Sequence, residues 1–390
     1  MRRAATLRAG GAHGSPAWLA AVLLALLAGC QAAPDGAAPS LRAAQPSPVA
    51  SSRAPTTEAS APAAQTPPGG DQTPSAVASP PAASVLGIVP AGRGAWAVGV
   101  SASLRRAYVT NRDEDTVTMI DLVDNRVLAT LPVGKDPHNV VVDEAANRVY
   151  VTLHGGPAGG DAVAVLDAAT GAVEATWPTG PYPAGLALNA TLGRLYVQNE
   201  GDNTLGVLDA SSGAPLARVS MPGILMDVAT STGSGRVYAP NWVANTLLTL
   251  NGEDQTIVGQ VSLGSMPWRV AVNPRTERVY VADGTSPGAD QGTLFTVDGW
   301  SGTISSRPLG AAPLGVTVDV ESDEVLVTDA RLNTLTVLDG AGQEVRWQGV
   351  IGQAPHTVVP VRALGRAYVV LSGPNALAVL DWPPRVLAGR

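Results

Sequence analysis

The chain contains very little cysteine and few aromatic residues. Of its 390 residues, one is Cys, 4% are aromatic and only Phe295 is a phenylalanine. A single cysteine excludes an internal disulfide framework and any zinc site built from several cysteines. Long apolar runs are also scarce. Residues 17–28 form an apolar run of about a dozen residues, and a run of this length is too short to cross a hydrocarbon layer of ~30 Å.

Recognisable catalytic apparatus is absent from the sequence as well. No Gly-rich phosphate loop follows a strand, no nucleophile elbow joins a strand to a helix, and no group of carboxylates with histidine resembles the metal-dependent lactonase propellers. The sequence therefore predicts no cofactor, no metal ligand and no catalytic residue. These absences favour a protein that is not an enzyme.

Glycine and proline are abundant, with 43 and 32 residues, which favours many short strands joined by tight turns. The formal charge is −7, and the first 29 residues contain Arg2, Arg3 and Arg8 but no acid. Without that segment the charge would be −10. An acidic chain of this kind disfavours nucleic acid as a partner.

The first thirty residues have the pattern of a secretory signal, with three arginines before the apolar run of residues 17–28. The run ends in Leu27-Ala28-Gly29-Cys30, which resembles a bacterial lipobox. This resemblance implies a signal peptide over residues 1–29, lipidation of Cys30 and stable anchoring to a membrane through acyl chains. Gln31, rather than Asp, follows the cysteine, which favours the outer membrane where the host has one. The alternative is an ordinary signal with an incidental cysteine.

Residues 30–83 are predicted to be a disordered tether. Eleven prolines lie between Gln31 and Ala83, among mostly Ala, Ser, Thr and Gln, with no aromatic residue. Such a segment cannot bury enough apolar surface to offset the entropy of ordering it. As a random coil it would span roughly 40 Å.

One pattern recurs from Ser84 to the end of the chain. A tyrosine position recurs at steps of 42 or 46 residues, at Tyr108, Tyr150, Tyr196, Tyr238, Tyr280, Leu326 and Tyr368. A polar position that closes the following strand recurs in step, at Asp121, Asp167, Asp209, Asn251, Asp298, Asp339 and Asp381. A period near 42 is typical of one propeller blade. The sequence therefore predicts an all-β, seven-bladed β-propeller of four-stranded blades over residues 84–390.

Ring closure is predicted from the same register. Ser84–Val89 lies 42 residues before a fourth strand and has no blade of its own. We expect it to complete the last blade and leave no open edge. Arg385–Ala388 falls in the same register and competes with Ser84–Val89 for the place of the fourth strand in the last blade, so the role of residues 385–390 stays open.

The repeat resembles a known family. Tyr108-Val-Thr-Asn111, Tyr150-Val-Thr and Tyr280-Val-Ala-Asp283 are similar to the YVTN family of bacterial propeller repeats, over the whole of residues 84–390. The resemblance implies the architecture more than the activity. Members resemble surface-layer proteins, periplasmic binding proteins and, in a minority, redox proteins.

Functional residues are expected on the face that carries the loops between blades. The extra residues of blades two and five fall there, and so do His138, His154 and His356. The first position of each blade forms a ring of Trp96, His138, Ala184, Met226, Trp268, Leu314 and His356. The candidate ligand-binding residues are Trp96, His138, His154, Asp227, Trp242, Trp268, Arg269 and His356. Three interpretations stay open: structural repeat residues, a binding basin, and a histidine metal site.

The sequence favours a monomeric, non-enzymatic protein anchored in the bacterial envelope and facing the periplasm or the exterior. Its propeller face would bind a small molecule, a glycan or a protein partner. One alternative is a propeller enzyme, either a lactonase-like hydrolase or a cofactor-dependent oxidoreductase, that uses the histidine-bearing face. The other is a purely structural surface-layer component.

Overall fold

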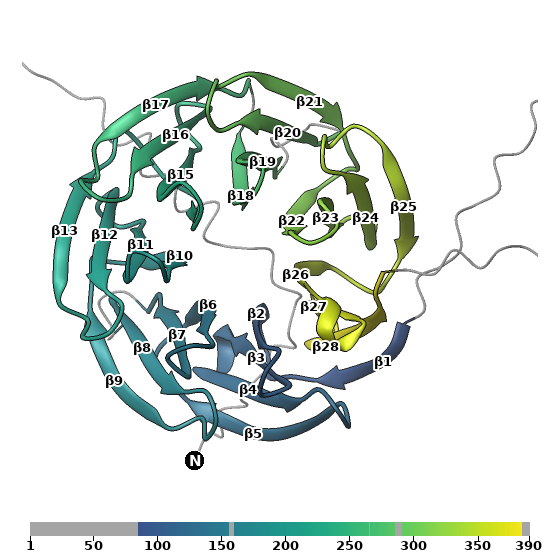
Figure 1. Ribbon diagram of the computed structural model, residues 1–390. Helices are drawn as coiled ribbons and strands as arrows, with labels where there is room; N and C mark the ends of the chain where they lie inside the picture. The colour runs from purple at the N-terminus through teal and green to yellow at the C-terminus, as the bar shows by residue number, and fades with distance from the viewer. Residues whose placement is uncertain (1–84, 156–159, 265, 285–290, 384–390) are drawn as a thin grey trace, which may run out of the picture. The chain divides into compact units, whose positions relative to one another are not determined.

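The computed structural model describes residues 85–155, 160–264, 266–284 and 291–383. Within them the chain folds into seven four-stranded antiparallel sheets, and Figure 1 shows these blades arranged around one axis. This confirms the predicted seven-bladed propeller. The predicted signal peptide (1–29), the lipidation site Cys30, the tether (30–83), Ser84 and residues 385–388 lie outside the described residues.

The strands occupy the same four places in every blade. The innermost strands are β2 (Ala95–Ser101), β6 (Pro137–Asp143), β10 (Pro183–Asn189), β14 (Ala229–Thr230), β18 (Pro267–Asn273), β22 (Pro313–Asp319) and β26 (Pro355–Val361). The second strands are β3 (Arg106–Asn111), β7 (Arg148–Leu153), β11 (Arg194–Asn199), β15 (Arg236–Asn241), β19 (Arg278–Asp283), β23 (Glu324–Asp329) and β27 (Arg366–Leu371). The third strands are β4 (Thr116–Asp121), β8 (Ala162–Asp167), β12 (Thr204–Asp209), β16 (Thr246–Asn251), β20 (Thr293–Asp298), β24 (Thr334–Asp339) and β28 (Ala376–Asp381). The outermost strands are β5 (Arg126–Pro132), β9 (Val173–Pro178), β13 (Pro215–Ser220), β17 (Ile257–Ser262), β21 (Ile304–Pro308), β25 (Val345–Val350) and β1 (Val85–Pro90).

Helical structure is limited to short turns in the described ranges. The 3₁₀ turns η1 (Arg112–Glu114) and η3 (Arg362–Leu364) have three residues each. No helix in these ranges is long and apolar enough to cross a membrane.

Apolar cores lie between neighbouring blades. Tyr108 of the first blade, for example, packs in one buried cluster with Val149 and Val151 of the second. The middle strands are therefore buried on both faces, which explains why they read as continuous apolar runs instead of alternating patterns. Five of the seven innermost strands begin at the proline before the ring position, whereas β2 begins at Ala95 and β14 at Ala229.

The ring closes as predicted, through a strand from the N-terminal side. β1 pairs antiparallel with β28, from Val85 opposite Leu380 to Pro90 opposite Ala376. Val89 is buried in the core shared with the first blade. Since Ala376 follows a loop between second and third strands, β1 ends on that side of the ring and begins on the other.

In blades one to five the recurring tyrosine and arginine join each blade to the next. The Tyr150 hydroxyl donates to the Ala210 carbonyl at 2.7 Å, and Arg148 Nη1 donates to the Ser211 carbonyl at 2.6 Å. Tyr108 and Tyr280 donate to the equivalent carbonyls of Ala168 and Gly340. These bonds satisfy buried carbonyls and fix the angle between blades.

The sixth blade departs from this pattern and is joined to the seventh in another way. Leu326 replaces the tyrosine, so it has no hydroxyl to donate. Instead, Asp319 Oδ2 accepts from the Trp382 indole nitrogen at 2.9 Å and from Arg362 Nε at 2.5 Å. The seventh blade therefore contacts the sixth through donors on its own turns.

The inter-blade bond predicts different costs for two conservative substitutions. Tyr150→Phe leaves the Ala210 carbonyl without its donor and should lower the free energy of unfolding by about 1–2 kcal/mol. Tyr368 has a buried hydroxyl with no partner among the described residues. Tyr368→Phe should therefore be neutral or slightly stabilising. Urea denaturation of both variants measures the difference, and equal losses would contradict this role for the hydroxyl.

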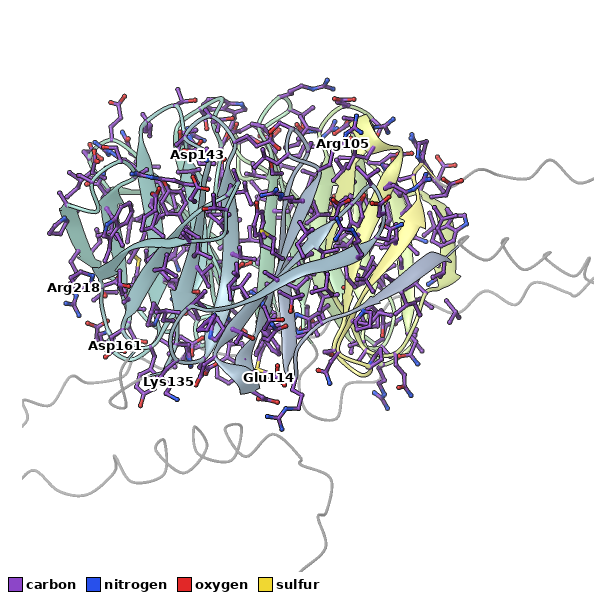
Figure 2. The ribbon with its side chains drawn as sticks, turned by 90° about the horizontal axis from the view of Figure 1, so that it is seen from below. Arg105, Glu114, Lys135, Asp143, Asp161 and Arg218 are labelled. Atoms are coloured by element: carbon purple, nitrogen blue, oxygen red, sulfur yellow. The ribbon has the colours of Figure 1, made fainter. Side chains whose placement is uncertain are left out.

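The propeller has two unlike faces, which Figure 2 shows edge-on. Arg105 and Asp143, in turns between first and second strands, lie at one face. Glu114, Lys135 and Asp161, in loops that join blades or connect second to third strands, lie at the other. We call the first the turn face and the second the loop face. The predicted insertions belong to the loop face, although residues 156–159 and 285–290 within them lie outside the described residues.

Candidate functional site

Three ring positions are brought together at the loop face. Trp96, His138 and His356 are each the second residue of an innermost strand. Their carbonyls all accept hydroxyl hydrogen bonds from a neighbouring strand: His138 from Thr110 (3.0 Å), His356 from Thr328 (2.5 Å) and Trp96 from Thr357 (3.3 Å). These bonds fix the backbone that supports each ring.

The side chains of these positions form a continuous row of rings. Trp96 lies between His356 and His138, with ring centroids 3.9 and 5.1 Å away. His138 contacts His154 at 5.4 Å, and His154 contacts Tyr182 at 5.3 Å. We call these five residues the His–Trp cluster. The predicted adjacency of His356, Trp96 and His138 therefore holds in the structure.

A row of charged side chains packs against the cluster. Arg112 binds Asp136 with two hydrogen bonds, Nε to Oδ1 at 2.6 Å and Nη2 to Oδ2 at 2.9 Å. His154 Nδ1 lies 3.3 Å from Asp136 Oδ2, and its Nε2 lies 3.2 Å from Glu200 Oε2. The Arg112 guanidinium also lies 4.8 Å from the Trp96 ring centroid. We call these four residues the charged row.

The carboxylates determine the charge of His154. Burial alone would lower the pKa of His154, but hydrogen bonds from its ring to Asp136 and Glu200 outweigh burial and raise the pKa to about 9. Burial would raise the pKa of Asp136, whereas His154 and Arg112 lower it well below its usual range. The row therefore alternates positive and negative charges at neutral pH.

The other two histidines are buried and neutral. Burial, reinforced by nearby positive charges that include Arg112 and Arg269, lowers the pKa of His138 and His356 well below the usual value. His138 Nδ1 and Trp96 Nε1 are buried and have no hydrogen-bond partner among the described residues. An unpartnered buried polar atom costs free energy, so these two nitrogens are the polar atoms of the cluster whose burial is not compensated by a hydrogen bond from the described residues.

A second column of the repeat supplies part of the charged row, and we did not identify it from the sequence. The residue directly after each second strand is, in blade order, Arg112, His154, Glu200, Trp242, Gly284, Ala330 and Ser372. Large polar or aromatic side chains thus stand over blades one to four, and small ones over blades five to seven. The site is asymmetric for this reason. The detectable signal was this change of side-chain size along the column.

We also did not identify Asp136, or the residues that position it, from the sequence. Its backbone nitrogen donates to Asp115 Oδ1 at 2.9 Å, while Lys135 Nζ donates to Asp115 Oδ2 at 2.6 Å. Asp115 itself has a left-handed backbone, with φ of 58°. It occupies a loop position at which Asp or Asn recurs in other blades, as at Asn203, Asn245 and Asn333. Here it bonds the loop into the next blade and so positions Asp136.

The remaining predicted residues are Asp227, Trp242, Trp268 and Arg269. Arg269 and Asp227 form a second ion pair, with Nη1 to Oδ1 at 3.7 Å, and Asp227 Oδ2 accepts from the Val270 nitrogen at 3.3 Å. Burial raises the pKa of Asp227, and Arg269 opposes it. Arg269 also acts on His138 and His356, so the two groups lie within electrostatic reach. Trp268 precedes Arg269 in β18, and the half-buried Trp242 donates its backbone nitrogen to the Ile224 carbonyl.

This arrangement is better suited to binding than to acid–base catalysis. His154 is held as a cation between two carboxylates, so it is a poor proton acceptor at neutral pH. In the described ranges, no three or more His, Cys, Asp or Glu side chains are placed to hold a metal ion. The pattern Gly-x-Ser-x-Gly occurs once, at residues 284–288, but between two strands and partly outside the described residues, so it is not a strand-to-helix elbow.

Comparison with known proteins supports the fold. No family model matches the sequence, and no curated protein matches it. Among solved structures, a chain of hydrazine synthase from Kuenenia stuttgartiensis is similar, with a TM-score of 0.68 and 14% identity. The match covers 75% of this chain and 96% of that chain. At this identity the similarity shows the propeller fold alone.

Proposed function

We propose that this chain is an envelope-anchored lipoprotein of YVTN-type repeats that binds a small polar ligand at the His–Trp cluster and does not act on it chemically. The observation that carries the proposal is the pair of buried nitrogens, Trp96 Nε1 and His138 Nδ1, beside a fully paired charged row. A ligand with a hydrogen-bond acceptor would satisfy the indole nitrogen.

The surroundings of the cluster support a preformed site. The ring backbones are fixed by hydroxyls from neighbouring strands, and the charged row fixes Trp96 and His154 from the side. Preorganisation of this kind lowers the cost of binding because few side chains need to be ordered. Small residues over blades five to seven would give the ligand access from that side.

The direction of β1 supports the anchoring part of the proposal. β1 begins at the turn face, so a tether attached to it would leave from the face opposite the cluster. A Cys30→Ser chain should lose its partition into membrane, and a chain that still partitions would refute lipidation.

Ligand binding is tested by melting shifts of the full chain against a broad panel of small polar molecules. We expect at least one compound to raise the melting temperature, because a ligand that binds only the folded state stabilises it. The shift should be lost in His138→Ala and His356→Ala variants that still melt cooperatively. The absence of a shift for every compound would instead favour a purely structural component.

A further inference from the structure

The turn face carries a second feature that the loop-face site does not use. A hollow of about 480 Å³ lies among turns of blades three, four and five, and this volume falls in the usual range for small-molecule sites. Its lining includes Trp300, Arg236, Asn251, Glu253, Ser234 and Thr191. Because these residues lie in turns on the face that carries Arg105 and Asp143, the hollow is on the opposite side from the His–Trp cluster.

The fold of the repeat does not require an exposed tryptophan at position 300. Trp300 is 62% exposed, in the turn between β20 and β21. The equivalent position in each blade is the second residue after the third strand ends. In blade order it holds Val123, Ala169, Ser211, Glu253, Trp300, Ala341 and Pro383. The turn therefore forms with small residues in other blades. Trp300 is therefore not required by the turn, and its exposed ring is free to pack against another molecule.

The indole is held in place from one side. The Arg236 guanidinium lies 4.3 Å from the Trp300 ring centroid, and Arg236 Nη1 donates to the carbonyl of Gly299. Arg236 occupies the repeated arginine position, so its own location is set by the inter-blade bond. The cation on one face orients the ring and leaves much of the remaining surface open to solvent.

The lining combines the apolar side chains of Trp300, Leu192 and Val258 with polar groups. Asn251 contributes an amide, Ser234 and Thr191 hydroxyls, Glu253 a carboxylate that would oppose an anion, and Arg236 a guanidinium that would oppose a cation. Ser234 already donates to Glu277, and Asn251 Oδ1 already accepts from the Glu253 nitrogen, so these two groups have only part of their hydrogen-bonding capacity left for a ligand. A sugar ring matches both properties, because its C–H face packs on an indole and its hydroxyl edge bonds to amides and carboxylates.

We propose that the hollow beside Trp300 is a carbohydrate-binding site for a neutral sugar or the end of a neutral glycan. A proline-rich peptide is the competing occupant, since such segments also pack on tryptophan. Grooves for polyproline segments are lined by aromatic side chains, whereas Trp300 is the one aromatic residue that lines this hollow in the described part of the chain.

The test is calorimetric titration of the full chain with neutral chito-, cello- and malto-oligosaccharides. We expect one series to bind, and Trp300→Ala to weaken its binding by about tenfold or more. Alanine already occupies this turn position in blades two and six, so the variant should fold. Glu253→Gln should weaken binding as well. Val123→Ala, at the position of the first blade that is equivalent to Trp300, should leave binding unaltered.

Three outcomes would overturn the proposal. The first is that no oligosaccharide binds, and the second is that one binds equally well to the Trp300→Ala chain. The third is that a synthetic peptide of residues 31–83 binds in a Trp300-dependent way while the sugars do not. None of these outcomes affects the loop-face site, because the two sites lie on opposite faces and share no residue.

Discussion

Asp136→Asn is expected to lower the free energy of unfolding by about 2–3 kcal/mol, because it leaves two partly buried cations without their shared carboxylate. Arg112 and His154 both bind this side chain, which is 29% exposed, and only His154 keeps a second carboxylate partner, Glu200. The substitution keeps the shape of the side chain and removes only its charge. The loss is measured by urea denaturation at pH 7.

The control for this experiment is an exposed acid with a single ion pair. Asp124 lies 3.6 Å from Arg126, with both side chains more than 60% exposed. Asp124→Asn should change stability by no more than about 0.5 kcal/mol. The Asp136→Asn chain should also show a lower pKa for His154 in an NMR titration. Similar losses in both variants, or an unchanged His154 titration, would mean that the charged row does not hold the site.

Stability is expected to be highest near pH 6.5–7 and to fall on both sides of it. The pKa of His154 is raised to about 9 in the folded chain, so its contribution is complete below pH 6.5 and is lost as pH rises through 9. This loss is on the order of 2–3 kcal/mol. The pKa values of His138 and His356 are lowered by burial, so the unfolded chain binds more protons below pH 6.5. Each of these histidines then costs up to about 1.4 kcal/mol per pH unit.

Two variants separate the acid and alkaline arms of this profile. His154→Gln should flatten the alkaline arm between pH 6.5 and 9 and leave the acid arm in place. His138→Phe should reduce the slope between pH 6.5 and 5.5 and leave the alkaline arm in place. Urea denaturation at one-unit pH intervals measures both slopes. A wild-type profile that is flat from pH 5.5 to 9 would show that these histidines do not titrate as their surroundings require.

The fold could be predicted from sequence because each blade repeats the same four-stranded pattern. The positions of Tyr150 and Asp167 recur along the chain because most blades share the same inter-blade hydrogen bond and the same strand ending. Ring closure by β1 followed from register alone. The sixth blade shows the limit of this logic, because the compensation for Leu326 comes from Trp382 and Arg362 of the seventh blade, which donate to Asp319 of the sixth.

The site was only half predictable for a related reason. Trp96, His138 and His356 share one repeat column, so their convergence at the axis followed from the period. The charged row depends on contacts between blades: His154 meets Asp136 from an interblade loop and Glu200 from the third blade, one repeat along the same column. These residues are 18 and 46 positions from His154. Only the packed blades bring them together, and no spacing within one repeat indicates it.

The most direct test of the loop-face site is calorimetric titration of a compound that shifts the melting temperature, into wild-type, Trp96→Phe and Trp177→Phe chains. Trp96→Phe keeps a ring in the His–Trp cluster but removes the buried indole N–H, so it should weaken binding by about tenfold. Trp177 packs in an outer strand against Tyr150, and its substitution should leave the affinity unchanged. Equal affinities for the wild-type and Trp96→Phe chains would contradict a ligand site at the His–Trp cluster.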